Sequence, residues 1–482
     1  MADSSPLLEG GFKATPSKSP FYALRQRLVR RKGDGEDAPP GVLDRAKDSM
    51  SRGGFANSSF VVMNAIMGSG LLALPYACKS AGIVLFLLLM TIMALCADYA
   101  IHLLLVCCDR FGVTSYEEVG QKAFGYRGNM AACLAIMLQN LGGMTGDLVI
   151  VGDLLPKVMT NCFGVAHGSL IANREFLMCL VTAVLVLPVA CLRRIGFIGY
   201  SSTIAIALMV CFAVAVIVQS FEFTCADTKA SGQTSGAHAD SSLTCQYDYF
   251  HVGMDTFFVL PTIAFSFVCH TTVLPAYAEL RKRSKAKMQR VSHTAIGICW
   301  SVYGLTAVFG YLSFGSGAVG DDGVIVRDDA HGTEANLFDS FSDYDPKSRI
   351  CVLRFLILLS FALIVPLLNY PARKSAIFIL NRGESADTSW GIFYSITFGY
   401  IGVVLLLALF IPNIKVVFGL VGSTTSVTLM FLLPGIFYLK LIPGKLTSRE
   451  KLPAVLHVAF GLLVMFVSLG GIFAKFAGVK VN

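Results

Sequence analysis

The chain has 482 residues, of which 55% are hydrophobic and only 15% charged, and its mean hydropathy is +0.66. A soluble domain carries about 25% charged residues, so this composition excludes an ordinary soluble protein and predicts a membrane protein. The net charge of +8 reflects how charges are distributed between loops, and it does not indicate nucleic-acid binding. We also expect no enzyme, because the sequence shows no nucleotide-binding loop, metal-ligand cluster or catalytic triad.

The first 54 residues are rich in Ser, Pro, Gly, Lys and Arg and poor in apolar residues, a composition typical of a disordered tail. They contain no long apolar stretch, so we expect no signal peptide. The segment from Asp3 to Leu8, in which two serines and a proline separate the acid from a pair of leucines, resembles the acidic dileucine signal that sorting adaptors bind for delivery to lysosomes. A cytosolic tail is where adaptors find such a signal.

Eleven apolar stretches are long enough to cross a bilayer as helices, and they predict an all-α polytopic membrane protein. They lie at about residues 55–77, 82–106, 129–154, 174–191, 195–220, 252–275, 291–314, 350–371, 391–412, 415–439 and 453–476.

The charged loops predict the orientation of the chain. The loop after the sixth stretch is basic at 281–287, whereas the loop after the seventh stretch is acidic at 321–345. With a cytosolic N-terminus, most Lys and Arg lie on the cytosolic side, as the positive-inside rule requires. Eleven spans then place the C-terminus outside the cell or in a lumen. The membrane is predicted to be the plasma membrane or the lysosomal membrane.

Two of the stretches are interrupted in the middle. The first, at 60–76, contains Gly-Ser-Gly at 68–70, and the sixth, at 252–275, contains two prolines and a polar run at 266–272. A helix that unwinds inside a bilayer exposes backbone groups that lipid cannot satisfy, so they must line a cavity or bind a ligand. Such breaks at matching places in two halves indicate the binding site of a secondary transporter built from inverted repeats.

The matching breaks divide the chain into two five-helix halves. We expect a cytosolic tail at 1–54, a first repeat at 55–220, an extracellular or lumenal loop at 221–251, a second repeat at 252–440, and a loop with an eleventh helix at 441–482.

Four motifs resemble the sodium-coupled neutral amino acid transporters, in the amino acid/auxin permease branch of the amino acid–polyamine–organocation superfamily. They are NAIMGSGLLALPYA at 64–77, TSYEEVGQKAFG at 114–125, FSFVCHTTVLPAYAEL at 265–280 and FGLVGSTTSVTLMFLLPGIFYLKL at 418–441. The resemblance implies the LeuT-type 5+5 inverted-repeat fold with one extra helix. It also implies a sodium symporter that carries small neutral amino acids such as glutamine and binds no covalent cofactor.

The first break is the candidate site for the substrate carboxylate. A helix that restarts after the break presents free N–H groups, which bind carboxylates well, and glycine permits close approach of the backbone. We assign Gly68, Ser69, Gly70 and Leu71 to this role, with a glycine packing kink as the alternative.

The second break is the candidate site for the ammonium group. We expect Phe265, Ser266 and Cys269 to supply carbonyl oxygens there. His270 follows directly, and its ordinary pKa near neutrality makes it a candidate proton switch. The alternative is that His270 makes a hydrogen bond that locks two helices together.

Three residues are candidates for the coupling cation. The resemblance links Asn64 to sodium, with polar packing as the alternative role. On the eighth span the family pattern places a hydroxyl where this chain has Ala362 and Ile364. Ser360 is the nearby residue with a hydroxyl, and it is therefore the candidate cation ligand on this span. This departure keeps a proton as the alternative coupling ion. Asp147, inside the third span, is the candidate proton acceptor or cation ligand, because membrane-embedded acids normally face an interior cavity or water.

Asp147 also has two alternative interpretations, a buried hydrogen bond or a position at the membrane edge. Asp98, in the second span, is a weaker candidate of the same kind because it lies nearer the cytosolic end.

Cys225 and Cys245 are the cysteines of the loop between the fifth and sixth spans. Because that compartment is expected to be oxidising, we expect a disulfide that closes a loop of about 20 residues and contributes about 3 kcal/mol. Most other cysteines lie within spans and are expected to act as small apolar residues.

A different class of function also fits the sequence. A lysosomal amino-acid sensor would use the tail for signalling and would transport slowly. The dileucine-like segment and the altered eighth span favour this alternative, whereas the shortage of apolar docking motifs in the tail weighs against it.

Overall fold

The computed structural model describes residues 53–166, 168–191, 195–222, 244–245, 247–314, 318–319, 333, 337, 347–380, 389–411 and 414–477. The chain divides into two units, Met1–Ser49 and Met50–Asn482, and every described residue belongs to the second. Some of the predictions concern residues outside this set. They are the tail up to residue 52 with its dileucine-like segment, Cys225 of the expected disulfide, and most of the acidic loop at 321–345.

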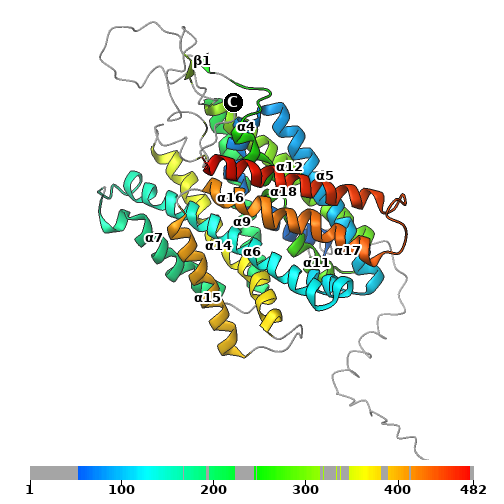
Figure 1. Ribbon diagram of the computed structural model, residues 1–482. Helices are drawn as coiled ribbons and strands as arrows, with labels where there is room; N and C mark the ends of the chain where they lie inside the picture. Colours follow the sequence, from blue (N-terminus) through cyan, green and yellow to red (C-terminus); the bar gives the residue numbers. More distant parts are fainter. Residues whose placement is uncertain are drawn as a thin grey trace, which may run out of the picture. The chain divides into compact units, whose positions relative to one another are not determined.

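The described chain is helical, with one short β-ladder (Figure 1). The predicted first repeat comprises α3 Phe55–Ile66, α4 Gly70–Ala81, α5 Ile83–Phe111, α6 Tyr116–Asn161, the 3-10 turn η1 Leu170–Ala172, α7 Arg174–Val181, the π-helical turn η2 Thr182–Val186, α8 Leu187–Ala190 and α9 Ile195–Glu222. The second comprises the 3-10 helix η4 Met254–Phe258, α10 Val259–Ser266, α11 His270–Glu279, α12 Lys285–Phe314, α14 Lys347–Leu380, α15 Trp390–Phe410, α16 Ile414–Val421, the π-helical turns η5 Gly422–Ser426 and η6 Thr428–Leu432, and α17 Leu433–Leu441. α18 Leu452–Phe476 follows, and β1 Thr244–Cys245 pairs antiparallel with β2 Ala318–Val319.

Both predicted interruptions are present. α3 ends at Ile66 and α4 restarts at Gly70, with a bend of 58° between them. Glycine is among the least favourable residues in a helix, so the Gly-Ser-Gly run is where the first span unwinds. In the sixth span α10 ends at Ser266 and α11 begins at His270. The unwound residues of both spans lie in the interior of the second unit, because almost all of them are buried.

Local signals set the ends of the helices that carry the site. α5 ends at Phe111 and is followed by Gly112, whose φ of 65° is the left-handed conformation typical of the residue after a helix. α6 begins with a capping box, in which Ser115 and Glu118 each satisfy a backbone N–H of the other. α6 is kinked at Phe124 and Gly125, so the third span proper begins after this kink.

Nine helices in the described ranges are long and apolar enough to cross a membrane, and the bent pair α3–α4 makes a tenth span. The predicted fourth span is represented by α7, η2 and α8, which run without a gap from Arg174 to Ala190 but make a shorter element than the others. The chain is thus a multi-pass, all-α membrane protein, whereas the count of eleven spans stays a prediction.

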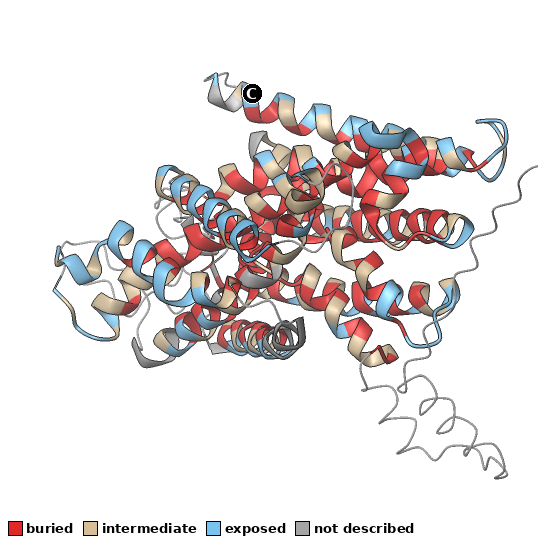
Figure 2. Ribbon diagram, turned by 90° about the horizontal axis from the view of Figure 1, so that it is seen from below, coloured by how far each residue is buried: buried red, intermediate tan, exposed pale blue. Residues whose placement is uncertain are grey.

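The helices that carry the breaks and the long helices α6 and α14 form the centre of the bundle. α6 packs along α14, and α10 packs against α4. The outer faces of α15 and α18 are largely exposed and apolar, as expected for surfaces that meet lipid. Figure 2 shows this division, with buried residues in the interior and exposed residues along the helix that ends at the C-terminus.

A disulfide that was not predicted from the sequence joins Cys162, after the end of α6, to Cys351 in the first turns of α14. The two cysteines are 189 residues apart in sequence. The bond ties the third span to the eighth near one end of each helix. The expected pair Cys225–Cys245 stays a prediction.

Candidate functional site

A cavity of about 60 Å³ lies where the two breaks meet α6 and α14. A water molecule takes about 10–15 Å³ of such space, so the cavity has room for several waters or for part of a small solute. Its wall comprises residues from α3, the first break, α4, α6, α10, the second break, α11 and α14. They are Asn64, Ala65, Ile66, Met67, Gly68, Ser69, Gly70, Gln139, Asn140, Gly143, Asp147, Phe265, Ser266, Val268, Thr271, Thr272, Ile364, Leu368 and Pro371.

The first break presents backbone amides to this cavity. No backbone acceptor is found within the described part of the chain for the N–H groups of Gly68, Ser69 or Gly70. The Gly68 amide donates instead to the hydroxyl of Tyr303 on α12. The amides of Ser69 and Gly70 are therefore the two that remain for a ligand, and adjacent donors at the start of a helix are an arrangement that binds a carboxylate.

The two breaks touch at Gly70 and Ser266. A Cβ atom on Gly70 would collide with the side chain of Ser266 and would lie 3.3 Å from its Cα. Ser266 is held in place by its own hydroxyl, which donates to the Thr262 carbonyl at 2.8 Å. Only glycine therefore fits at position 70 while the two spans keep this contact.

Two buried polar side chains of the cavity wall have atoms without partners among the described residues. Neither the oxygen nor the nitrogen of the Asn64 amide has a hydrogen-bond partner there, although the residue is only 3% exposed. Asp147 is 1% exposed, and its Oδ2 likewise has no partner. Its carboxyl group receives a hydrogen bond from the side chain of Ser69. Because unpaired buried polar atoms are costly, these groups indicate a place for a polar or cationic ligand.

The second break supplies a carbonyl and an aromatic wall. Ser266 ends α10, and no backbone bond joins its carbonyl to the helix that follows in the described chain. The ring of Phe265 stacks on Phe418 of α16, with a centroid distance of 4.7 Å. The Cys269 carbonyl is occupied by the amides of Thr272 and Val273 at 2.9 and 3.1 Å, and Cys269 does not line the cavity.

Three other predicted site residues lie away from the cavity wall. Leu71 is fully buried in the core beside it. His270 is fully buried, with its Nε2 3.3 Å from the carbonyl of Ala97 on α5, which is the contact expected of a helix-locking residue. Ser360 donates to the carbonyl of Ala205 on α9 at 3.2 Å. Their proposed roles in transport stay predictions.

On the eighth span, the residue that reaches the cavity is apolar. Ile364 lines the wall at the position where the resemblance places a hydroxyl. The side chain of Ala362 lies outside what the structure describes. Asp98 lies elsewhere, between α5 and α12, where His293 Nδ1 is 2.8 Å from its Oδ1 and Gln289 Nε2 donates to both carboxylate oxygens at 3.1 Å.

Four polar residues of the wall were not selected from the sequence. Gln139 and Asn140 on α6, and Thr271 and Thr272 on α11, all line the cavity. A Gln-Asn pair inside an otherwise apolar span was the available signal, since lipid-facing positions would exclude it.

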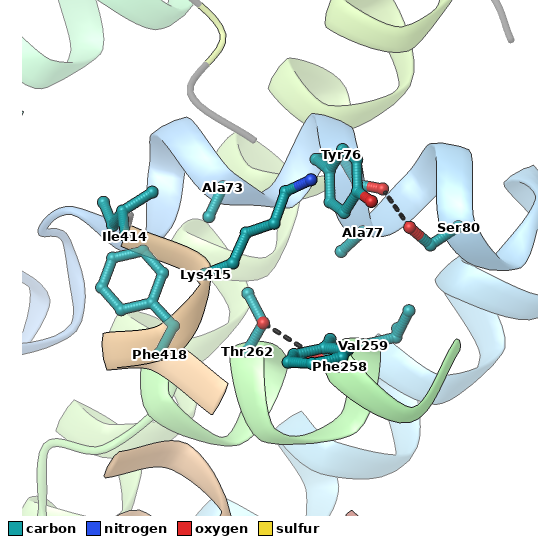
Figure 3. A pocket seen from close by; sticks show the side chains of 10 residues that line it. All are labelled: Ala73, Tyr76, Ala77, Ser80, Phe258, Val259, Thr262, Ile414, Lys415 and Phe418. Atoms are coloured by element: carbon teal, nitrogen blue, oxygen red, sulfur yellow. Dashed lines mark hydrogen bonds between the residues drawn. The ribbon is translucent and has the colours of Figure 1, made fainter. Parts of the chain in front are cut away.

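A second, smaller pocket lies on the other side of Phe418 (Figure 3). It is lined by Ala73, Tyr76, Ala77, Ser80, Phe258, Val259, Thr262, Ile414, Lys415 and Phe418. The side chain of Lys415 reaches across it from α16 to α4, where Nζ lies 3.7 Å from the ring centroid of Tyr76. We call this space the outer pocket. It is separated from the cavity by the stacked pair of Phe265, which lines the cavity, and Phe418, which lines the outer pocket.

Comparison with known families gives one match that spans most of the chain. The sequence model described as "Transmembrane amino acid transporter protein" matches residues 51–474. The match includes both breaks, α6 and α14.

Solved structures of transporters share the fold. A manganese transporter mutant from Eremococcus coleocola is 14% identical, with a TM-score of 0.56 and coverage of 93% of this chain and 92% of that one. A sodium-coupled sialic acid symporter in a substrate-bound, outward-open state is 12% identical, with a TM-score of 0.53 and coverage of 88% and 91%. A nucleobase-cation-symport-1 transporter with bromovinylhydantoin bound is 12% identical, with a TM-score of 0.51 and coverage of 88% and 92%. At these identities the likeness shows the fold, which is the LeuT-type fold.

Proposed function

Because the chain belongs to the transmembrane amino acid transporter family, we propose that it is a secondary active transporter of small neutral amino acids driven by a cation. One observation carries this proposal. The amides of the first break and the unpaired atoms of Asn64 and Asp147 face one cavity inside the membrane bundle. An amino acid zwitterion together with a cation would satisfy all of these groups.

The substrate carboxylate binds the amides of Ser69 and Gly70, beside Gly68, where the start of α4 favours negative charge. The ammonium group binds on the opposite side of the cavity, at the Ser266 carbonyl, beside the ring of Phe265. Most of the remaining wall is apolar, which suits a neutral side chain.

The cation binds next to the substrate. Sodium prefers oxygen ligands, and Asn64 Oδ1 and Asp147 Oδ2 are wall oxygens without partners in the described chain. The carboxylate of Asp147 balances the charge of the cation, so that the loaded site of cation, zwitterion and Asp147 is neutral. A neutral loaded site costs less to enclose inside the hydrocarbon region than a charged one.

A proton is the second candidate for the coupling ion. Span eight presents Ile364 to the cavity, and the hydroxyl of Ser360 is hydrogen-bonded to α9 instead. Asp147 can accept a proton, which would neutralise the site in the same way as sodium. This observation favours proton coupling over a sodium site shared with the eighth span.

The test is uptake of labelled glutamine into proteoliposomes. A sodium gradient is imposed first, and then a proton gradient without sodium. We expect one gradient to drive accumulation above the equilibrium level. Facilitated equilibration without accumulation under both gradients would contradict cation coupling, and the absence of any amino acid uptake would contradict the transport proposal.

A further inference from the structure

The carboxamide of Gln139 has a fixed orientation at the cavity wall. Its Oε1 accepts hydrogen bonds from Thr425 Oγ1 at 2.7 Å and from Ser426 Oγ at 2.9 Å. A carboxamide oxygen has two lone pairs, so these two hydroxyls use its accepting capacity. The NH₂ group is left for the cavity, and no acceptor for Nε2 is found among the described residues.

The two hydroxyls come from a π-helical turn, η5, which spans Gly422–Ser426. π-helical turns are uncommon and frequently occur at functional sites. Gly422 packs directly against the backbone of Pro261, where a Cβ would collide with its carbonyl. The turn is thus held against α10 of the broken sixth span while Thr425 and Ser426 hold Gln139.

The neighbouring carboxamide has the opposite orientation. Asn140 also lines the cavity, and its Nδ2 donates to the carbonyl of Ile136 at 2.7 Å. Its Oδ1 remains as an acceptor. The pair therefore offers the cavity one hydrogen-bond donor group and one acceptor group.

Gln139 and Asp147 lie at two separate levels of the cavity wall along α6. Gln139 and Asp147 are two turns apart, which is about 12 Å at 1.5 Å per residue. Gly143 lies midway and lines the cavity. A Cβ there would find Leu368 Cδ1 at 3.4 Å and the Phe265 ring at 3.9 Å. Gln139 therefore lies apart from the candidate cation site at Asp147, with Leu368 and Phe265 packed over the part of α6 between them.

We propose that Gln139 and Asn140 bind the side chain of the substrate and determine how strongly the site discriminates a terminal carboxamide from an apolar side chain. This assignment rests on the proposed function. Gln139 Nε2 donates to the side-chain carbonyl, and Asn140 Oδ1 accepts from the side-chain NH₂. Thr425 and Ser426 are positioning residues, because they act through Gln139.

The experiment compares glutamine with methionine, which has a side chain of similar length and no terminal hydrogen-bonding groups. Initial uptake rates into proteoliposomes give kcat/KM for each substrate, for the wild type and for Gln139→Leu. We expect the glutamine-to-methionine ratio to fall about tenfold, because only glutamine loses hydrogen bonds in the variant. An equal loss for both substrates, or an unchanged ratio, would overturn the assignment.

Two further variants keep the test decisive if Gln139→Leu does not fold. Thr425→Val combined with Ser426→Ala keeps Gln139 but removes the two hydrogen bonds that fix the orientation of its carboxamide. This double variant should lower the glutamine-to-methionine ratio by a smaller factor of about threefold. Gln219→Leu is the matched control, because Gln219 is a buried carboxamide on α9 that does not line the cavity. A fall of the ratio in the control, or none in the double variant, would count against the assignment.

Failure of this assignment and failure of the proposed function are distinguishable. If the wild type carries methionine and other neutral amino acids but shows no dependence on Gln139, only the side-chain assignment fails. If the wild type carries no amino acid, the proposed function fails and the assignment fails with it.

Discussion

The cavity at the two breaks, which we call the central cavity, and the outer pocket lie on the two sides of the Phe265–Phe418 pair. Their polar groups differ in whether they have hydrogen-bond partners. In the central cavity, Asn64 and Asp147 have buried atoms without partners in the described chain, and the amides of the first break have no backbone acceptor there. In the outer pocket, the hydroxyls of Ser80 and Thr262 donate to carbonyls of their own spans at 3.0 and 2.6 Å.

The difference indicates which of the two spaces binds a ligand. A broken helix cannot satisfy its own backbone, so the central cavity needs a polar guest to complete its hydrogen bonds. The outer pocket is lined by helical residues that lie outside the two breaks, mostly with apolar side chains, so no unwound backbone there requires a ligand. Under the proposed function the central cavity is the binding site, and we predict that the outer pocket, whose wall includes Lys415, lies on the route to it.

The largest expected effect is that of Gly70→Phe. The phenyl ring would collide with Ser266 and fill the cavity beside the amides of the first break, so amino acid binding and uptake should be abolished. Binding of labelled glutamine to purified protein measures this directly. Gly399→Phe is the control, because nothing lies within 4 Å of a Cβ placed on Gly399. Retained uptake by a folded Gly70→Phe protein would refute the carboxylate role of the first break.

Asp147→Asn should uncouple cation from substrate. The amide keeps the shape of the side chain but removes the charge that balances the cation, so the increase of substrate affinity caused by the cation, typically about 5–150-fold, should be lost. If a proton is the coupling ion, the variant should also lose the pH dependence of uptake. Substrate affinity measured with and without sodium, across about pH 5–8, checks both effects.

The control for that experiment is Asp98→Asn, because Asp98 is paired with His293 and Gln289 away from the cavity. An unchanged cation response in Asp147→Asn would return Asp147 to a structural role. The same loss in both variants would indicate a general effect of removing a membrane-embedded charge.

Lys415→Met tests the outer pocket and should have a smaller effect. A charge on the route to a site mainly changes the rate of encounter, so we expect KM for the amino acid to rise about threefold with kcat little changed. The cation response should remain intact, since Asp147 is untouched. A complete loss of binding would contradict the division between site and route, and would place part of the binding site in the outer pocket.

The smallest effect on transport is expected from Cys162→Ser, because the Cys162–Cys351 disulfide belongs to neither space. Removing a native disulfide typically costs about 2–5 kcal/mol of stability. Thermal unfolding in detergent should therefore shift to lower temperature, while uptake by the folded protein at low temperature should be nearly unchanged. A large loss of uptake without loss of stability would show that the bond holds α6 and α14 in a geometry that transport requires.

Much of the architecture could be predicted from local sequence. The apolar stretches predict membrane helices because a bilayer demands about 20 apolar residues in a helix. The Gly-Ser-Gly run predicts where the first span unwinds because glycine disfavours helices. These are short-range properties, and the structure confirms the helices and both breaks.

The candidate site was only partly accessible to such reasoning. Asn64, Asp147, Phe265 and Ser266 were selected from the sequence, and all four line the cavity. Ser360 was selected for its hydroxyl, but the rotation of α14 turns that hydroxyl toward Ala205 and presents Ile364 instead. Successive residues of a helix point in directions about 100° apart. A small error in the expected rotation of a helix about its axis therefore changes which neighbour a side chain contacts.

Runs of neighbouring residues thus specify that this is a membrane protein, where its helices lie and where two of them break. Helix packing determines which side chains line the cavity together. Packing brought Gln139 together with Thr425 and Ser426, which are 286 and 287 residues further along the chain, and it paired Cys162 with Cys351. Such contacts depend on how the helices approach and rotate against one another, and no local pattern in the sequence specifies that.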